Sequence, residues 1–331
     1  MKSVSRADAA ADRRERIAAL GFDYAAQPTR PVDACNLCGG GEFVVLTHRD
    51  RYGYPATARG CRRCGLVFLA PVMTAAAYAR FYVDVYRPLV SAYHGRLIDA
   101  ETIQAEQREY AIERGDLLAP FLDGRSGGRL LDIGGSTGIV AQALCTRFGL
   151  TGTVLDPSPL EIEQARALGL ETIAGFVEDW QAGGRMFDVV VMCQTVDHLL
   201  DVTGALGGIR RLMVPGGVFF VDIVDFRAAY LRHWSVEEAI KIDHPYSLTA
   251  DTMAALLKRA GFAMAAVDYA ADHLHIGYVC RPTAIEDDAL PEPAAVAGLW
   301  REIRYVQNVR RPGSFRTRDG GSERTRPTRE R

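Results

Sequence analysis

Residues 129–148 constrain the fold of this 331-residue chain more than any other stretch. They read as a short apolar run, a glycine-rich turn at 134–138 and an amphipathic helix pattern. The apolar run is typical of a parallel strand that is covered on both faces. Gly134 and Gly135 permit a tight turn and a close backbone approach that a side chain would block. This order of elements directs free backbone N–H groups toward a ligand at the carboxyl end of the strand.

Apolar runs and helix patterns alternate along the chain as far as residue 280. This alternation predicts a doubly wound α/β fold with a mostly parallel, seven-stranded sheet. The last two predicted strands are joined by too few residues for a crossover helix, so we expect them to pair antiparallel. Besides the strand before the glycine turn, strands are predicted at 153–156, 171–174, 187–193, 218–224, 262–269 and 274–280.

Four cysteines near the N-terminus form two Cys-x-x-Cys pairs, Cys35 with Cys38 and Cys61 with Cys64. Cysteines at i and i+3 on a turn can both coordinate one tetrahedral ion, so the two pairs predict a zinc ribbon. We call residues 31–70 the ribbon. A structural zinc is the preferred interpretation, because a module of this size cannot form a sufficient core of its own. A nucleic-acid-binding role is the alternative, but the ribbon lacks a large basic cluster with interleaved aromatic residues.

Composition argues against several classes of partner. The formal net charge of -2 gives no global reason to expect nucleic acid or an anionic membrane. No apolar run approaches the roughly 20 residues of a membrane span, and the N-terminus lacks the apolar segment of a signal peptide. Cysteines in a metal site, not in disulfides, fit a reducing compartment. We therefore expect a cytoplasmic enzyme with a small-molecule substrate, and neither a nucleic-acid nor a membrane partner.

The residues of the glycine turn discriminate between two kinds of cofactor site. A nicotinamide site requires Gly-x-Gly-x-x-Gly, in which the third glycine lets helix and strand pack closely. Here Asp132 is followed by a small residue at every second position, namely Gly134, Ser136 and Gly138. A carboxylate at this place suits the cationic end of a ligand better than a pyrophosphate.

This pattern resembles the (Asp/Glu)-x-Gly-x-Gly-x-Gly motif of the class I S-adenosylmethionine-dependent methyltransferases, with Ser136 in place of the middle glycine. The resemblance implies a Rossmann-like methyltransferase sheet that binds S-adenosylmethionine at the turn. It also implies that Asp156 binds the ribose hydroxyls and that residues 176–178 flank the adenine. Asp156 could instead stabilise the start of the next helix through the helix dipole. The implied cofactor-binding residues are Asp132, Gly134, Gly135, Ser136, Gly138, Asp156, Phe176, Val177, Glu178 and Gln194.

A ribbon ahead of such a domain is similar to the sugar methyltransferases of antibiotic and polysaccharide pathways, including the C-methyltransferases of deoxysugars. These carry a histidine after the fourth strand, which His198 matches, and a Glu-His pair, which Asp243 and His244 match with Asp in place of Glu. A tyrosine after the ribbon belongs to the same site, and Tyr82 or Tyr86 could supply it. The resemblance therefore implies these five residues as the catalytic set. It also implies a nucleotide-linked sugar or a natural-product intermediate as the acceptor.

Methyl transfer to a hydroxyl, or to a carbon beside a ketone, requires a base. Histidine is the natural base near pH 7, and a carboxylate can orient it. Either His198 or His244 could act, and each could instead cap a helix or pack in a loop. C-, O- and N-methylation stay open, as do protein and nucleic-acid acceptors. A binding scaffold on a degenerate fold and an NAD-dependent oxidoreductase are the alternatives from other classes.

We expect six segments along the chain. The ribbon separates an N-terminal helix and linker from a helical lid on the substrate side. The S-adenosylmethionine-binding domain follows, and an acidic linker with a last helix leads to an arginine-rich tail, which we expect to be disordered. The expected boundaries are 1–30, 31–70, 71–124, 125–282, 283–309 and 310–331.

Overall fold

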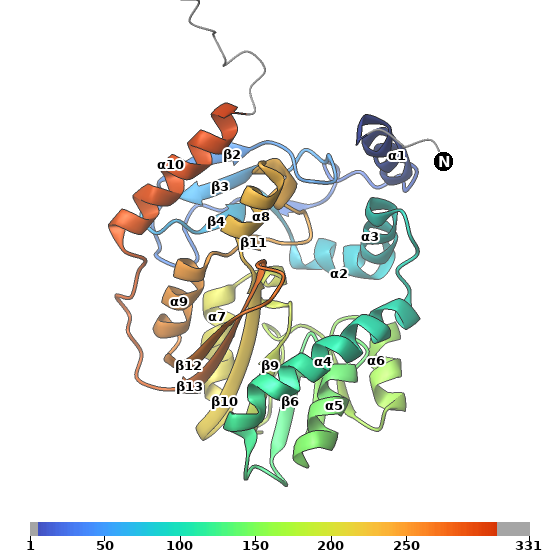
Figure 1. Ribbon diagram of the computed structural model, residues 1–331, viewed down its shortest axis with the longest axis vertical. Helices are drawn as coiled ribbons and strands as arrows, with labels where there is room; N and C mark the ends of the chain where they lie inside the picture. The colour runs from blue at the N-terminus through green and yellow to red at the C-terminus, as the bar shows by residue number, and fades with distance from the viewer. Residues whose placement is uncertain (1–5, 310–331) are drawn as a thin grey trace, which may run out of the picture.

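A computed structural model describes residues 6–309 of the protein (Figure 1). The arginine-rich tail expected at 310–331 lies outside the described residues. A seven-stranded sheet with the strand order β12-β13-β10-β9-β6-β7-β8 occupies the lower half of the view. Strand β13 runs antiparallel to both neighbours, and the other pairs are parallel. The expected α/β fold with a terminal antiparallel strand pair is therefore confirmed.

Alternate residues of the central strands face two different layers of helices, as the period of a strand requires. Leu130 and Val189 lie in one buried cluster with residues of α4, α5 and α6, whereas Leu131 and Val190 lie in another with residues of α7 and α9. The strands are β6 (Arg129–Ile133), β7 (Thr151–Asp156), β8 (Glu171–Ala174), β9 (Phe187–Met192), β10 (Met213–Val224), β12 (Phe262–Tyr269) and β13 (His275–Pro282). The covering helices are α4 (Ala100–Leu122), α5 (Ile139–Phe148), α6 (Pro159–Ala167), α7 (Val202–Arg211) and α9 (Ala250–Arg259).

The ribbon forms a second sheet of four strands above the carboxyl edge of the first (Figure 1). Its strands are β2 (Phe43–Thr47), β3 (Ala58–Cys61), β4 (Val67–Leu69) and, from much later in the chain, β11 (Tyr246–Ser247). Strand β11 pairs antiparallel with β4, with Tyr246 opposite Phe68. A two-stranded sheet of β1 (Thr29–Arg30) and β5 (Val72–Met73) flanks it. The ribbon sheet therefore contains a strand from a segment that we assigned to the cofactor-binding domain.

Five further helices surround the ribbon. Helices α2 and α3 follow it in the chain, and α1 lies beside α3 (Figure 1). Helix α10 lies across the ribbon sheet, and Trp300 packs so closely on Gly60 that a Cβ there would come within 2.2 Å of the indole. The bounds are α1 (Arg6–Ala18), α2 (Ala75–Asp84), α3 (Tyr86–His94), α8 (Phe226–His233) and α10 (Pro293–Val309).

Three elements differ from the sequence-based expectation. Strand β10 begins at Met213 and not at residue 218, because the Pro-Gly-Gly segment lies within the strand as an irregularity in its pairing with β9. Helix α8 and strand β11 were not predicted, since neither has a long periodic pattern of its own. No helix within residues 6–309 is both long and apolar enough to cross a membrane.

Candidate active site

The glycine turn after β6 is shaped by close packing. Gly134 has φ of +69°, and a Cβ there would lie 2.3 Å from the Thr195 hydroxyl oxygen. A Cβ on Gly135 would lie 2.6 Å from the Asp132 carboxyl carbon. Gly138 has φ of +80°, and a Cβ there would come within 2.8 Å of Ala165. At these three glycines the turn therefore has no room for a side chain.

Two side chains at the turn have buried polar atoms without a partner. Asp132 is 1% exposed, and neither of its carboxylate oxygens has a hydrogen-bond partner among the described residues. The Ser136 hydroxyl, at a residue with φ of +52°, is also buried without one. Burial, and then the nearby charge of Asp156, raise the pKa of Asp132 to about 7. Such atoms are costly unless a ligand satisfies them, and a cationic donor fits them best.

Asp156, at the end of β7, holds the turn against the start of α6. Its Oδ2 accepts a hydrogen bond from the Ser136 N–H at 2.9 Å, and its Oδ1 accepts one from the Ser158 N–H at 2.8 Å. Burial raises the pKa of Asp156 to about 6, and Glu161 adds to this effect. Each oxygen keeps a second lone pair, so ribose binding stays compatible with these bonds.

The remaining residues of the implied cofactor set lie along the same edge. Gln194 follows β9 with φ of +51°, and its N–H donates to Asp222 at 2.6 Å. Tyr110 of α4 donates to the same carboxylate at 2.6 Å. Phe176, Val177 and Glu178 follow β8, and Glu178 accepts a hydrogen bond from the Leu200 N–H at 3.0 Å. Sequence reasoning did not single out Tyr110, because no motif surrounds it.

Four of the five implied catalytic residues lie together in a second polar group, where they form hydrogen bonds or close contacts with one another. Tyr82 of α2 lies with its hydroxyl 2.7 Å from His198 Nδ1 and donates to the Asp243 carbonyl at 3.1 Å. The rings of His198 and His244 have centroids 4.4 Å apart. Tyr86 contacts this group through its ring alone, 6.1 Å from the His198 ring. The structure thus favours Tyr82 over Tyr86 as the tyrosine that orients a histidine.

The hydrogen bonds of Tyr82 fix which nitrogen of His198 is available. Because Tyr82 donates to a carbonyl, its oxygen accepts from His198 Nδ1–H, and Nε2 keeps its lone pair. Burial, and then the neighbouring His244, lower the pKa of His198 to about 4. His198 is therefore neutral at pH 7 and offers one hydrogen-bond acceptor.

His244 is held by a carboxylate that sequence reasoning missed. Asp197, in the short helix η1 (Val196–His198), lies with Oδ2 2.6 Å from His244 Nδ1. Burial alone would raise the pKa of Asp197, but His244 holds it well below its usual range. Lys241 Nζ lies 3.3 Å from His244 Nε2, and an Asp243 oxygen lies 3.4 Å from it. The Asp-His and Lys-x-Asp-His sequences were visible signals for Asp197 and Lys241.

The ribbon fixes the loop that carries His244. Asp50, which is 1% exposed, accepts a hydrogen bond from the Ile242 N–H at 3.1 Å. The Tyr78 hydroxyl donates to the Ile242 carbonyl at 2.8 Å, and the Leu69 N–H donates to the Pro245 carbonyl at 2.9 Å. Strand β11 then continues the loop into the ribbon sheet. The position of His244 is therefore set by bonds that join its loop to residues 164 to 192 positions earlier in the chain.

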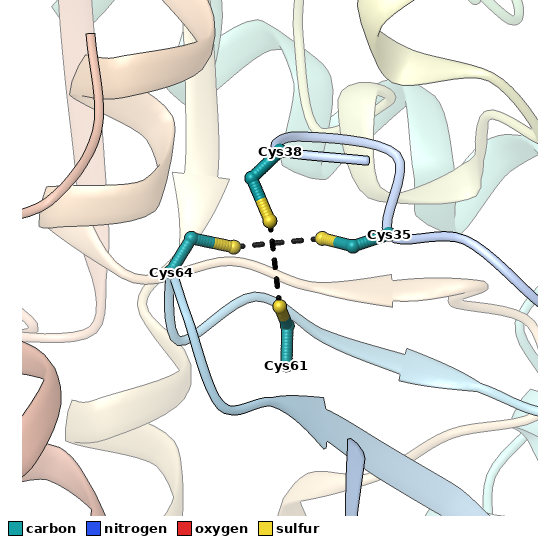
Figure 2. Close-up of side chains that lie close together, drawn as sticks. All are labelled: Cys35, Cys38, Cys61 and Cys64. Atoms are coloured by element: carbon teal, nitrogen blue, oxygen red, sulfur yellow. Dashed lines mark hydrogen bonds between the residues drawn. The ribbon is translucent and has the colours of Figure 1, made fainter. Parts of the chain in front are cut away.

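Four cysteine sulfurs converge on one point of the ribbon (Figure 2). The sulfurs of Cys35 and Cys64 are 3.5 Å apart, as are those of Cys38 and Cys61, and none forms a disulfide. All four lie within 4.8 Å of one another, which suits one tetrahedral ion. Ligand atoms of Asp197, His198 and His244 are similarly close, but there Lys241 competes for a histidine nitrogen.

The central part of the chain is similar to known methyltransferases. Residues 104–267 match a family model described as a methyltransferase domain. A ubiquinone biosynthesis O-methyltransferase of Methylobacterium nodulans is 35% identical over 99 residues, which are 28% of this chain and 39% of that protein. The protein of the same name from Cereibacter sphaeroides is 30% identical over 160 residues, 44% of this chain and 64% of that protein. The chain thus spans less than two thirds of these curated relatives.

Solved structures also resemble the chain. Magnesium protoporphyrin IX methyltransferase from Synechocystis PCC 6803 is 10% identical with a TM-score of 0.46, covering 56% of this chain and 89% of that one. A methyltransferase from Streptomyces caelestis is 17% identical with a TM-score of 0.42, covering 51% of this chain and 95% of that one.

Proposed function

We propose that this chain, whose residues 104–267 form a class I S-adenosylmethionine-dependent methyltransferase domain, transfers a methyl group to a small molecule with His244 as general base. The observation that carries the proposal is the 2.6 Å contact between Asp197 and His244. Asp197 and His198 closely follow Thr195, whose side chain packs against Gly134 of the cofactor turn. A carboxylate-oriented histidine next to a cofactor turn is the arrangement that proton removal requires.

The glycine turn fits the amino-acid end of S-adenosylmethionine. The unpartnered oxygens of Asp132 and Ser136 would accept from its ammonium group, and Asp156 would bind its ribose. When bound, this cofactor supplies an electrophilic methyl group on a sulfonium. The close packing of Thr195 on Gly134 brings the histidines, which follow in the chain, toward the same edge of the sheet.

His244 Nε2, which Lys241 Nζ contacts at 3.3 Å, would give up that contact to accept the proton of the acceptor while the new bond to the methyl carbon forms and the sulfur–methyl bond breaks. Asp197 orients the imidazole through Nδ1 and stabilises the imidazolium that results. His198 has a different role. Its pKa of about 4 makes it a weak base at pH 7, so its Nε2 would accept a hydrogen bond that positions the acceptor.

A nucleotide-linked sugar is the acceptor that we favour. The cluster of two histidines, two aspartates and a tyrosine offers many hydrogen bonds, which suits a ligand rich in hydroxyl groups. The resemblance of the sequence around His198 and His244 to sugar methyltransferases favours the same class. The name of the matched relatives suggests a phenolic hydroxyl as the second candidate.

A structural Zn²⁺ in the four-cysteine cluster is part of the proposal. The ion would hold the two cysteine turns together and so support the sheet in which β11 follows the His244 loop.

Turnover of S-adenosylmethionine against a panel of nucleotide sugars and phenols tests this function. We expect turnover with the nucleotide sugars, loss of S-adenosylhomocysteine binding in Asp156→Ala, and retained binding in His198→Ala. A thermal profile that is unchanged by S-adenosylmethionine and by S-adenosylhomocysteine would contradict the proposal.

A further inference from the structure

Two arginines flank one buried tyrosine where α1, α3 and the loop after β2 meet. The guanidinium carbon of Arg13 lies 4.2 Å from the centre of the Tyr93 ring, and that of Arg51 lies 4.5 Å from it. Tyr93 is 7% exposed, and the ring of Tyr52 packs against it edge-on at 5.3 Å. Two cations are thus held against one rigid aromatic support.

Neither arginine is neutralised by the described part of the chain. No carboxylate there lies within the 4.0 Å of an ion pair from Arg13 or Arg51, and the Nε of each is buried without a hydrogen-bond partner. Their neighbours differ. Arg16, one turn further along α1, pairs with Asp12, and Arg96 pairs with Glu106 at 2.8 Å. Unpaired guanidinium groups that are partly buried are costly unless an anion binds them.

The positive charges reinforce one another. Burial lowers the pKa of His94, and the charges of Arg51, Arg96 and Arg13 lower it further. Adjacent like charges destabilise a folded chain, so they are retained most easily where a ligand of opposite charge compensates them.

The cluster continues into the proposed acceptor site through Arg51. The Arg51 N–H donates to the Ile240 carbonyl at 2.9 Å, and the next residue in the chain is Lys241, whose pKa the Arg51 charge lowers in addition to the larger effect of burial. Lys241 Nζ lies 3.3 Å from His244 Nε2. A molecule whose anionic group lies on Arg13 and Arg51 would thus have Lys241, and beside it His244, next to the cluster.

We propose that Arg13 and Arg51 bind the diphosphate of a nucleotide-linked acceptor, with α1 as one wall of the acceptor site. The planar guanidinium group bonds two phosphate oxygens at once, which suits a diphosphate better than a single carboxylate. This inference rests on the proposed function, because it supplies the part of the substrate that the histidine cluster does not bind.

Calorimetric titration of the full chain with thymidine diphosphate, uridine diphosphate and inorganic pyrophosphate tests the inference. We expect Arg51→Gln and Arg13→Gln each to weaken nucleoside diphosphate binding by about tenfold or more. Arg16→Gln is the matched control on the same helix, and we expect its affinity to stay within about twofold of wild type. If a glutamine variant does not fold, Arg51→Lys keeps the charge but not the bidentate geometry, and we expect a smaller loss.

Equal affinity in wild type and in the arginine variants would overturn the inference, as would the absence of any nucleoside diphosphate binding to wild type. Binding of pyrophosphate that nucleoside diphosphates do not displace would also overturn it. Titration of the same samples with S-adenosylhomocysteine separates this inference from the proposed function. A protein that binds S-adenosylhomocysteine and methylates a phenol, but binds no diphosphate, would retain the function and lose the inference.

Discussion

The cofactor side and the acceptor side of the candidate active site are built in opposite ways. Most of the cofactor side comes from one continuous stretch, 129–138, which Asp156, residues 176–178 and Gln194 complete. The buried oxygens of Asp132 and Ser136 have no partner among the described residues. The acceptor side is assembled from three distant segments, and Tyr82, His198, Asp197 and His244 already bond or contact one another. The first has the free buried oxygens that the proposed binding of a charged ligand needs, and the second has the oriented histidines that the proposed proton transfer needs.

This difference separates binding from catalysis. Changes on the cofactor side should alter affinity for S-adenosylhomocysteine, and changes on the acceptor side should alter kcat with little effect on that affinity.

The substitution His244→Gln should have the largest effect. It removes the proposed base but keeps a hydrogen-bonding side chain, so we expect kcat to fall by about 10² to 10⁴-fold. Affinity for S-adenosylhomocysteine should stay within about twofold of wild type. His198→Gln is the matched control, with an expected loss of about tenfold. If steady-state kinetics show a larger loss of kcat in His198→Gln than in His244→Gln, then His198 is the base and the proposed roles are wrong.

Loss of the proposed zinc ion should affect the loop that carries His244, although the four cysteines lie outside that loop. We expect Cys61→Ser to lower the zinc content measured by atomic emission and to lower kcat by about tenfold to 100-fold, because the ribbon sheet no longer fixes the residues around His244. Cys145→Ser, which changes a cysteine of α5 outside the cluster, is the control. Full kcat in a zinc-free protein would show that the acceptor side does not depend on the ribbon.

Asp132 should make cofactor binding depend on pH. Its pKa is about 7 in the ligand-free protein, and only the ionised carboxylate can pair with the ammonium group of the ligand. Affinity for S-adenosylhomocysteine should therefore increase by about tenfold from pH 6 to pH 8, as the fraction of ionised Asp132 rises. In Asp132→Asn this dependence should disappear. A dependence that persists in the variant, measured by calorimetry, would assign it to another group.

Tyr82→Phe should have the smallest effect. It removes the hydroxyl that joins His198 Nδ1 to the Asp243 carbonyl, and a bond of this kind contributes about 1 kcal/mol, or roughly fivefold in kcat. Tyr86→Phe removes a hydroxyl that is not part of this bridge, and we expect kcat within about twofold of wild type. Equal losses in the two variants would mean that the bridge has no special role.

The two sides also differ in how far the sequence predicted them. The cofactor turn, its strand and the terminal strand pair follow from local patterns, since glycine spacing and apolar runs are read within a few residues. Asp197 and Lys241 stand next to or near a histidine in the sequence, but they were missed because their importance comes from contacts with His244 that only the folded chain shows. For the same reason Tyr82 and Tyr86 could not be separated until α2 was placed against η1.

Strand β11 was missed for a related reason. Two residues are too short for a periodic signal, and they form a strand only because the edge of β4 is there to pair with them. The start of β10 shows the opposite case. The proline and glycine signals at 215–217 predicted a break before the strand, but these residues lie inside β10, where its pairing with β9 is irregular.

The ribbon sheet takes its fourth strand, β11, from a much later segment of the chain, and this has a consequence for folding during synthesis. On the ribosome, the cysteine turns and strands β2 to β4 emerge long before residues 246 and 247, so the ribbon sheet first exists with the β4 edge unpaired. An open strand edge invites pairing with other chains. We therefore expect the nascent ribbon to depend on early metal binding or on chaperones until β11 has been synthesised and pairs with β4.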